Sequence, residues 1–180
     1  MKRPPAEGPS RVDEITAVAM FRVSLVLGCA CLVLVTCSPA STAAVGRQAM
    51  ELVKEGGQLQ ALRDLLQGHS DIAKGYRTPA PQSRSLLHEA AQHDDREVAA
   101  YLISEMDIDL LAVDSRGFTA LHLSAGTGHM DMSYALVKTS RGLAAMSMRD
   151  HSSHMTPAEW ARKYGHTRTA AFLDDMADLQ

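Results

Sequence analysis

Histidine and cysteine are the residues of this chain with the greatest capacity for chemistry, and their placement limits the possible reactions. The sequence has eight His and three Cys among its 180 residues. Imidazole binds metals or transfers protons near neutral pH, and a thiolate acts as a nucleophile or a soft metal ligand. The cysteines, Cys29, Cys31 and Cys37, all fall in one apolar segment. The remaining chain therefore has no thiol for a disulfide, a nucleophile or a metal site.

Other catalytic signatures are absent from the sequence. It has no G-x-S-x-G elbow, no H-E-x-x-H zinc motif and no glycine-rich phosphate loop. His151 and His154 lie three residues apart beside serines, and with His122 they could bind a surface metal. We keep that metal site as a remote alternative. The main prediction is a protein with no enzyme activity and no cofactor.

Composition favours helices and argues against a nucleic-acid partner. Aromatic residues make up only 4% of the chain, which suits helices packed through small and aliphatic side chains. The net charge is −3, and the chain beyond residue 44 has 14 basic and 18 acidic residues with no run of Lys or Arg. A nucleic-acid binder needs a basic patch. We therefore predict an all-α domain that binds neither DNA nor RNA.

A recurring pattern positions most of the histidines. The segment SLLHEAA at 85–91 aligns with TALHLSA at 119–125, 34 residues later, and TPAEWA at 156–161 follows after another 37. Nine residues after each start comes a helix-breaking pair, and a second apolar run follows it. These pairs are Asp94-Asp95, Gly128-His129 and Gly165-His166. Each unit therefore reads as helix, turn, helix.

This pattern resembles the ankyrin-repeat family, which implies an all-α solenoid of helix-turn-helix units with hairpin finger loops. The resemblance covers residues 44–180 as one domain, with a weaker first copy inferred from the apolar pattern at 48–66. Outer repeats often lose the internal signature because one flank faces solvent. The implied repeats span about 45–67, 83–113, 114–149 and 150–180, with an inserted, projecting loop at 68–84.

The resemblance also assigns structural roles. In the T-P-L-H motif, imidazole links a Thr or Ser hydroxyl to the backbone of a neighbouring repeat, and a Gly-His pair ends the first helix. The finger at 114–119 matches D-x-x-G-x-T, whereas the finger at 150–156 is one residue longer. The structural residues are thus Ser85, His88, Asp114, Gly117, Thr119, His122, Gly128, His129, Thr156, Pro157, Gly165 and His166; His154 lies near the glycine position of the longer finger.

The resemblance implies a protein partner bound by side chains that repeat packing leaves free, at finger tips and at the ends of the first helices. By register these are Arg116, Phe118, Tyr164, Lys163, Gln92, His93, Thr127, Ser115, His151 and His154. We expect Arg116, Phe118 and Tyr164 to matter most, because Arg and aromatic residues dominate interface energetics. Trp160, in contrast, is expected in the core, where it would replace volume lost at Ala158. We expect a monomer that acts as an adaptor or as a regulator or inhibitor of its partner.

The N-terminal residues 1–43 predict an extension and a signal peptide. Residues 23–37 form an apolar run without charge, preceded by Arg22, and are short for a membrane-spanning helix. Met20 would give a compact basic leader, so translation could start there. Small residues allow cleavage after Ala40 or Ala43. We therefore predict a secreted or periplasmic protein.

Two other fates of this segment stay open. Residues 34–38 resemble a lipobox, although Thr36 is a poor match, and lipidation of Cys37 would tether the domain to a membrane. An uncleaved apolar run would also anchor it. In either case the protein would be a membrane-tethered structural component, and membrane contact would involve only the N-terminal segment.

Overall fold

The computed structural model describes residues 39–179, and within that range every regular element is a helix. Predictions on earlier residues, including the start at Met20, the apolar run at 23–37 and lipidation of Cys37, lie outside the described residues. The helices are α2 (Pro39–Glu55), α3 (Leu59–Leu66), α4 (Ser70–Gly75), α5 (Leu86–Gln92), α6 (Arg96–Ser104), α7 (Ala120–Thr127), α8 (Met130–Val137), α9 (Ser140–Met146), α10 (Pro157–Lys163) and α11 (Thr167–Asp178).

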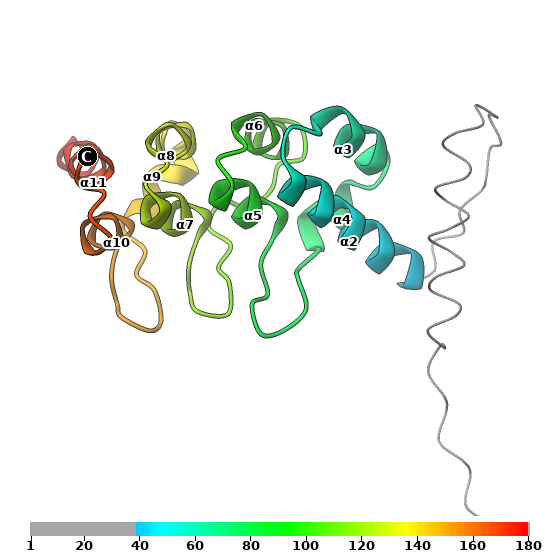
Figure 1. The fold of residues 1–180 in the computed structure, drawn as a ribbon, viewed down its shortest axis with the longest axis horizontal. Helices are drawn as coiled ribbons and strands as arrows, with labels where there is room; N and C mark the ends of the chain where they lie inside the picture. The colour runs from blue at the N-terminus through cyan, green and yellow to red at the C-terminus, as the bar shows by residue number, and fades with distance from the viewer. Residues whose placement is uncertain (1–38, 180) are drawn as a thin grey trace, which may run out of the picture. The chain divides into compact units, whose positions relative to one another are not determined.

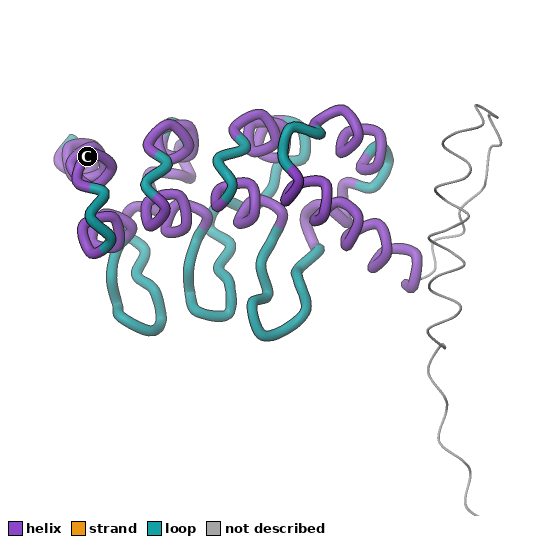
Figure 2. Tube along the Cα trace, viewed as in Figure 1, coloured by secondary structure: helices purple, strands orange, loops and turns teal. Residues whose placement is uncertain are grey.

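The helices stack as successive pairs in two rows. Figure 1 shows α2, α5, α7 and α10 side by side in one row, which we call the inner helices, and α3, α6, α8 and α11 in a second row, the outer helices. Three loops project from the inner row on the side away from the outer row (Figure 2). We call them finger 1 (76–85), finger 2 (110–119) and finger 3 (147–156).

The inner helices α5, α7 and α10 begin where a hydroxyl residue leaves the finger in an extended conformation. Ser85 and Thr119 share φ −85° and ψ 169°, and Thr156 has φ −79° and ψ 164°. The hydroxyls of Thr119 and Thr156 accept hydrogen bonds from the backbone N–H three residues later. This satisfies a donor that the first helical turn would leave unpaired. Each finger therefore feeds directly into a capped helix.

Small and aliphatic residues fill the space between the rows. Leu86, Ala90, Ala91 and Leu102 are fully buried in the second pair, and Ala125 and Leu136 occupy related places in the third. Alanine on the inner helices lets neighbouring pairs approach closely, while leucine fills the gap to the outer helices. The predicted helix-turn-helix units and their core residues are thus present.

Two segments differ from the sequence-based boundaries. The predicted loop at 68–84 holds a helix, α4, followed by finger 1, because Ala73 is buried and secures one helical turn against α2 and α3. The third pair is followed by α9, which packs on α7, α8 and α11 and lengthens that unit from 34 to 37 residues. In addition, α2 starts at Pro39, before the predicted domain start at residue 44.

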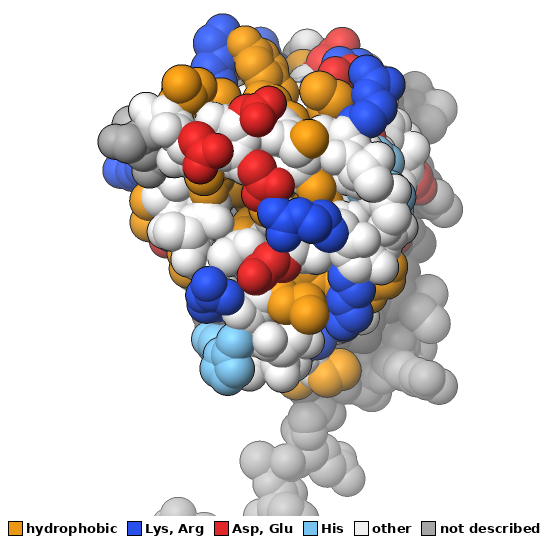
Figure 3. All heavy atoms as spheres, turned by 90° about the vertical axis from the view of Figure 1, so that its left-hand side faces the viewer, with side chains coloured by type: hydrophobic (Ala, Val, Ile, Leu, Met, Phe, Trp, Pro, Cys, Tyr) orange, Lys and Arg blue, Asp and Glu red, His pale blue; other side chains and the backbone are white. Residues whose placement is uncertain are grey.

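The last pair presents a polar end. Arg162 stands where the preceding inner helices have buried Ala91 and Ala125, and its Nη2 donates to both carboxylate oxygens of Asp174 at 2.6 Å. Figure 3 looks onto this end and shows side chains of both charges over α10 and α11. The departures of the fourth repeat at Glu159 and Arg162 therefore suit a face in contact with water.

Within residues 39–179, no helix combines the length and the apolar character that crossing a membrane requires.

Gly46 offers a test of how the first helix packs. It is buried in α2, and a Cβ added to it would lie 2.0 Å from the ring of Tyr76 in finger 1. We predict that Gly46→Ala lowers the free energy of unfolding by about 1–3 kcal/mol, because the ring must move to relieve the overlap. Urea unfolding followed by circular dichroism measures the change. Gly75→Ala is the matched control, since a Cβ there meets nothing within 4 Å; equal effects of the two substitutions would contradict the contact.

Candidate functional site

Two imidazoles join the helix pairs to one another. His88 Nε2 lies 2.8 Å from the carbonyl oxygen of Phe118 in finger 2, and its Nδ1 lies 2.6 Å from Ser85 Oγ. A carbonyl can only accept, so Nε2 carries the proton and donates, and Nδ1 accepts from the Ser85 hydroxyl. Burial lowers the pKa of His88 from 6.5 to about 4. This ring is therefore a neutral, fully bonded bridge.

His122 repeats this arrangement one pair later. Its Nδ1 lies 2.9 Å from Thr119 Oγ1 and its Nε2 lies 3.2 Å from the carbonyl oxygen of Met155 in finger 3. Burial again lowers the pKa of the imidazole. In the last pair Glu159 takes the same place, and its carboxylate accepts from the Thr156 backbone N–H at 2.7 Å, which lowers the pKa of Glu159. Both T-P-L-H histidines are thus structural.

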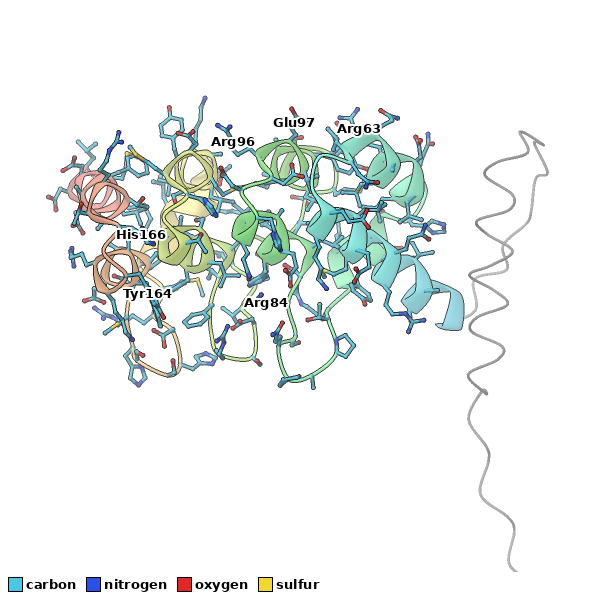
Figure 4. All side chains as sticks on the ribbon, in the orientation of Figure 1. Arg63, Arg84, Arg96, Glu97, Tyr164 and His166 are labelled. Carbon is cyan, nitrogen blue, oxygen red and sulfur yellow. The ribbon has the colours of Figure 1, made fainter. Side chains whose placement is uncertain are left out.

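The histidines of the Gly-His pairs contact the preceding unit. Gly128 and Gly165 have φ of 81° and 82°, and each follows its inner helix at the turn into the outer helix. His129 Nε2 lies 3.2 Å from the carbonyl oxygen of Gln92 on α5. The ring of His166 packs against Gly128 (Figure 4). His129 and His166 therefore contact the unit that precedes them in the chain, whereas His88 and His122 are hydrogen-bonded to the finger that follows them.

Buried aspartates shape the finger tips. Asp114 Oδ1 accepts from the backbone N–H of Arg116 at 2.8 Å and of Phe118 at 3.0 Å, and Gly117 at the tip has φ 82°. Asp150 takes the same role in finger 3 and accepts from Ser153 N, Met155 N and Trp160 Nε1. These hydrogen bonds lower the pKa of Asp150 far below its usual value. The segment from Asp150 to Thr156 is one residue longer than that from Asp114 to Thr119, and His154 adopts the positive φ, 53°.

Neighbouring fingers are hydrogen-bonded to one another. Ser115 N donates to Gln82 O at 3.0 Å, and its hydroxyl donates to Pro81 O. His151 N donates to Arg116 O at 2.9 Å. His122 is occupied at both ring nitrogens, so it cannot join His151 and His154 in a metal site without breaking the bridge. Among residues 39–179, no group of three His, Cys, Asp or Glu side chains is placed to hold a metal ion.

Aromatic rings and cations gather where finger 2 meets α10. The rings of Phe118 and Trp160 meet edge to face with centroids 5.0 Å apart, and Tyr164 stacks on Trp160 at 5.2 Å. Arg116 Cζ lies 4.7 Å from the centroid of Phe118, and Lys163 Nζ lies 4.3 Å from that of Trp160. We call these five residues the aromatic-cation cluster.

Exposure within the cluster differs from the sequence-based expectation at one position. Tyr164 is 56% exposed, and Arg116 and Lys163 are also exposed. Phe118 was expected at a free tip but is only 7% exposed, because its ring turns inward against Trp160 and His122. Phe118 is therefore a buried member of the cluster. The surface that a partner can reach consists of Arg116, Lys163 and Tyr164.

Trp160 is buried as expected, but for a different reason. It is 8% exposed and contacts Phe118 and Tyr164 on the finger side of α10. Ala158 is two residues away, so it points to nearly the opposite side of the helix. There it lines an open groove of about 280 Å³ beside Leu143 and other apolar residues. The volume missing at Ala158 is thus left as a groove.

The other predicted contact residues differ in how exposed they are and in whether their side chains are already hydrogen-bonded. His93 and Thr127 are exposed, although the Thr127 hydroxyl donates to Leu123 O at 2.8 Å. His151 and His154 are exposed on finger 3, and Ser115 is exposed but tied to finger 1. Gln92 is half-buried and accepts from Arg84 Nη1.

Sequence reasoning missed a buried charge cluster between fingers 1 and 2. Arg84 is 8% exposed, and its Nη1 lies 3.5 Å from Glu89 Oε1 while its Nε lies 3.9 Å from Asp114 Oδ2. Burial of three charged residues is costly unless they pair. The available signal was Glu89, a carboxylate at the position that Leu123 and Trp160 occupy in the later repeats.

Comparison with known proteins identifies a family and a partial relative. A family described as ankyrin repeats (3 copies) matches residues 49–142 and 87–180. A region of 100 residues is 32% identical to part of diacylglycerol kinase zeta of Rattus norvegicus, covering 55% of this chain and 10% of that protein. The chain therefore spans about a tenth of the length of this relative.

The neutral state of His88 predicts a specific dependence of stability on pH. Between pH 6.5 and about 4 the unfolded chain binds a proton that the folded chain excludes. The free energy of unfolding should therefore fall by up to about 3 kcal/mol as the pH drops through this window. Above pH 6.5 the neutral ring of His88 should give its full contribution to stability. Urea unfolding at a series of pH values measures the slope.

Two variants test whether His88 causes this pH dependence of the free energy of unfolding. His88→Asn removes the titrating ring, so it should be less stable near neutral pH and should flatten the slope, leaving the smaller part due to His122. His151→Asn, at an exposed ring of finger 3, should keep the wild-type slope. A His88→Asn variant with an unchanged slope would exclude this role.

Proposed function

The chain belongs to the ankyrin-repeat family, and on that premise we propose that it is a non-catalytic adaptor or regulator that binds its partner protein through the aromatic-cation cluster. Ankyrin repeats indicate a protein-protein interaction module. Fold alone does not name the partner. The cluster carries the proposal, since it combines exposed Tyr, Arg and Lys side chains on a rigid base.

The physical properties of the cluster suit binding. Arg116 and Lys163 rest on ring faces and Tyr164 on Trp160, so these long side chains are partly ordered before a partner arrives. Ordering interface side chains costs about 0.5–1.5 kcal/mol for each one. A preordered set reduces that cost. Tyr and Arg are also enriched among the residues that contribute most to interfaces.

Two histidines and two aspartates of the stack are engaged in structural hydrogen bonds. His88 and His122 are hydrogen-bonded at both ring nitrogens. The carboxylates of Asp114 and Asp150 accept hydrogen bonds from backbone N–H groups of the fingers. The similarity to diacylglycerol kinase zeta involves a tenth of that protein, within the repeat region of this chain. A match of that extent carries no kinase activity over to this chain.

We further propose that the protein acts outside the cytoplasm as a soluble, monomeric regulator of an exported partner. The proposal rests on the uncharged run at 23–37, on Arg22 before it, and on the small residues around Ala40 and Ala43. Cleavage after Ala40 or Ala43 would remove the first two or five residues of α2. A membrane-tethered component is the second candidate, favoured by the Cys at position 37 within a lipobox-like segment.

Intact-mass measurement of the protein from its own cells tests the location. We expect a chain that begins at Ser41 or Ala44, because signal peptidase reads the small residues before these positions. A chain that begins at a lipidated Cys37 would establish the tethered alternative. A mass that includes the whole apolar run would exclude cleavage.

A three-residue variant tests the binding surface. Arg116→Ala, Lys163→Ala and Tyr164→Ala together should weaken binding to a partner identified by crosslinking by at least about tenfold, because they remove the accessible part of the cluster. Phe118 and Trp160 stay unchanged to preserve packing. Titration calorimetry with the purified partner measures the affinity.

The outer helices offer a matched control. Arg96→Ala, Lys138→Ala and Tyr134→Ala remove the same kinds of side chain, and Tyr134, at 53% exposed, matches Tyr164 closely. This control should bind as the wild type does. Equal affinity of both variants and the wild type would remove the cluster from consideration as the binding surface.

A further inference from the structure

The fold separates the charges of an acidic chain. Fingers 1 to 3, together with α5, α7, α10 and the residues that end these helices, span 76–93, 110–128 and 147–164. We call this part the finger side. It holds six basic residues, Arg77, Arg84, Arg116, Arg149, Arg162 and Lys163, and four acidic residues, Glu89, Asp114, Asp150 and Glu159. It is therefore net positive although the whole chain is net negative.

Three of the four carboxylates of the finger side are turned inward, and the fourth, Glu159, is half-buried. Glu89, Asp114 and Asp150 are exposed by 4%, 3% and 0% respectively. Asp114 and Asp150 accept finger N–H groups, and Glu89 lies against Arg84. Glu159, the fourth, accepts from Thr156 N and pairs with Arg149 at 3.3 Å. The carboxylates of this side thus serve the structure, and a partner meets mainly cations.

Nearby carboxylates neutralise the accessible cations only in part. Arg116 Nε lies 3.7 Å from buried Asp114 Oδ2, but that oxygen also faces Arg84, so two guanidinium groups share one carboxylate. Lys163 rests on Trp160 and pairs with no carboxylate within residues 39–179. At the finger end of the face in Figure 3, the charged side chains in view are basic or His. The surface potential is therefore positive around the cluster.

The outer side has the opposite balance. Residues 57–75, 94–109, 129–146 and 165–179, which hold the outer helices with α4 and α9, have twelve acidic and six basic residues. Figure 4 places Glu97 on this side, together with Arg63 and Arg96, which pair with Glu105 and Asp131. An acidic partner would be repelled by this side and attracted to the finger side.

We propose that the aromatic-cation cluster binds an acidic segment of the partner protein, in which carboxylates flank one aromatic or aliphatic side chain. The carboxylates pair with Arg116 and Lys163, and the apolar side chain packs on the exposed ring of Tyr164. Guanidinium and ammonium groups are the usual partners of carboxylates, and a stacked tyrosine offers apolar area. The assignment rests on the proposed function and specifies the chemistry of its ligand.

The burial of the rings favours a protein segment over a membrane surface. A surface that enters the headgroup region presents Trp, Phe or Leu side chains for insertion. Here Phe118 and Trp160 are 7% and 8% exposed and are committed to the contact between finger 2 and α10. Only Tyr164 is available. Binding to lipid therefore becomes an outcome to be tested rather than the expectation.

A pair of labelled peptides tests the sign of the charge that is recognised. The first alternates Glu with Phe and Leu, and the second carries Lys in place of every Glu. Fluorescence anisotropy with the full chain should show at least about tenfold tighter binding of the acidic peptide. This preference should shrink from about 0.1 M to about 1 M salt, as the Debye length falls from about 10 to about 3 Å.

Charge reversal locates the binding. Arg116→Glu with Lys163→Glu should weaken binding of the acidic peptide by at least about tenfold, since attraction becomes repulsion at both positions. The control Lys138→Glu reverses an exposed charge just after the end of α8 and should leave the affinity within about twofold. Circular dichroism of each variant verifies that the helices remain folded.

Each contrary outcome overturns the inference. Equal binding of the two peptides, tighter binding of the Lys peptide, no binding up to about 1 mM, or unchanged affinity of the reversed variant would each do so. So would binding to phosphatidylserine vesicles that is as strong as peptide binding and equally sensitive to the reversal. The proposed function stands or falls separately, because the three-residue alanine variant is judged on the intact partner.

Discussion

The stack depends on a neutral imidazole that spans from the start of one inner helix to the next finger. His88 donates to Phe118 O and accepts from Ser85, and His122 does the same between Met155 O and Thr119. A buried hydrogen bond to the carbonyl of a finger fixes the angle of that finger to the helices. Burial keeps the pKa of each ring low, which leaves the acceptor nitrogen free for the hydroxyl.

The same bridge prepares the candidate binding surface. The carbonyl that His88 holds belongs to Phe118, whose ring supports Arg116 and meets Trp160 edge to face. A structural hydrogen bond is therefore directly connected to the residues that a partner would touch. Because fingers are also hydrogen-bonded to each other, through Ser115 and His151, the cluster is preorganised by several repeats together. Preorganisation of this kind reduces the entropic cost of binding.

Specific residues show how far the sequence could predict this site. The T-P-L-H spacing identified His88 and His122, and register placed Arg116, Lys163 and Tyr164 on one side, where the structure has them exposed. Register could not reveal that Phe118 turns inward, since that depends on Trp160 arriving from the next repeat. The sequence pattern did not predict the helices α4 and α9, because each is short and lies outside the repeating motif.

The sequence by itself determined the period, the capped helix starts and the glycine turns, and its resemblance to ankyrin repeats indicated the histidines that link repeats. The caps and turns follow from spacing and residue type, because they are governed by neighbours along the chain. Tertiary structure alone decided which charges face outward. The sequence does not distinguish a carboxylate such as Asp150 from a surface residue, and only the packing of fingers against helices buries it and leaves a positive surface on an acidic protein.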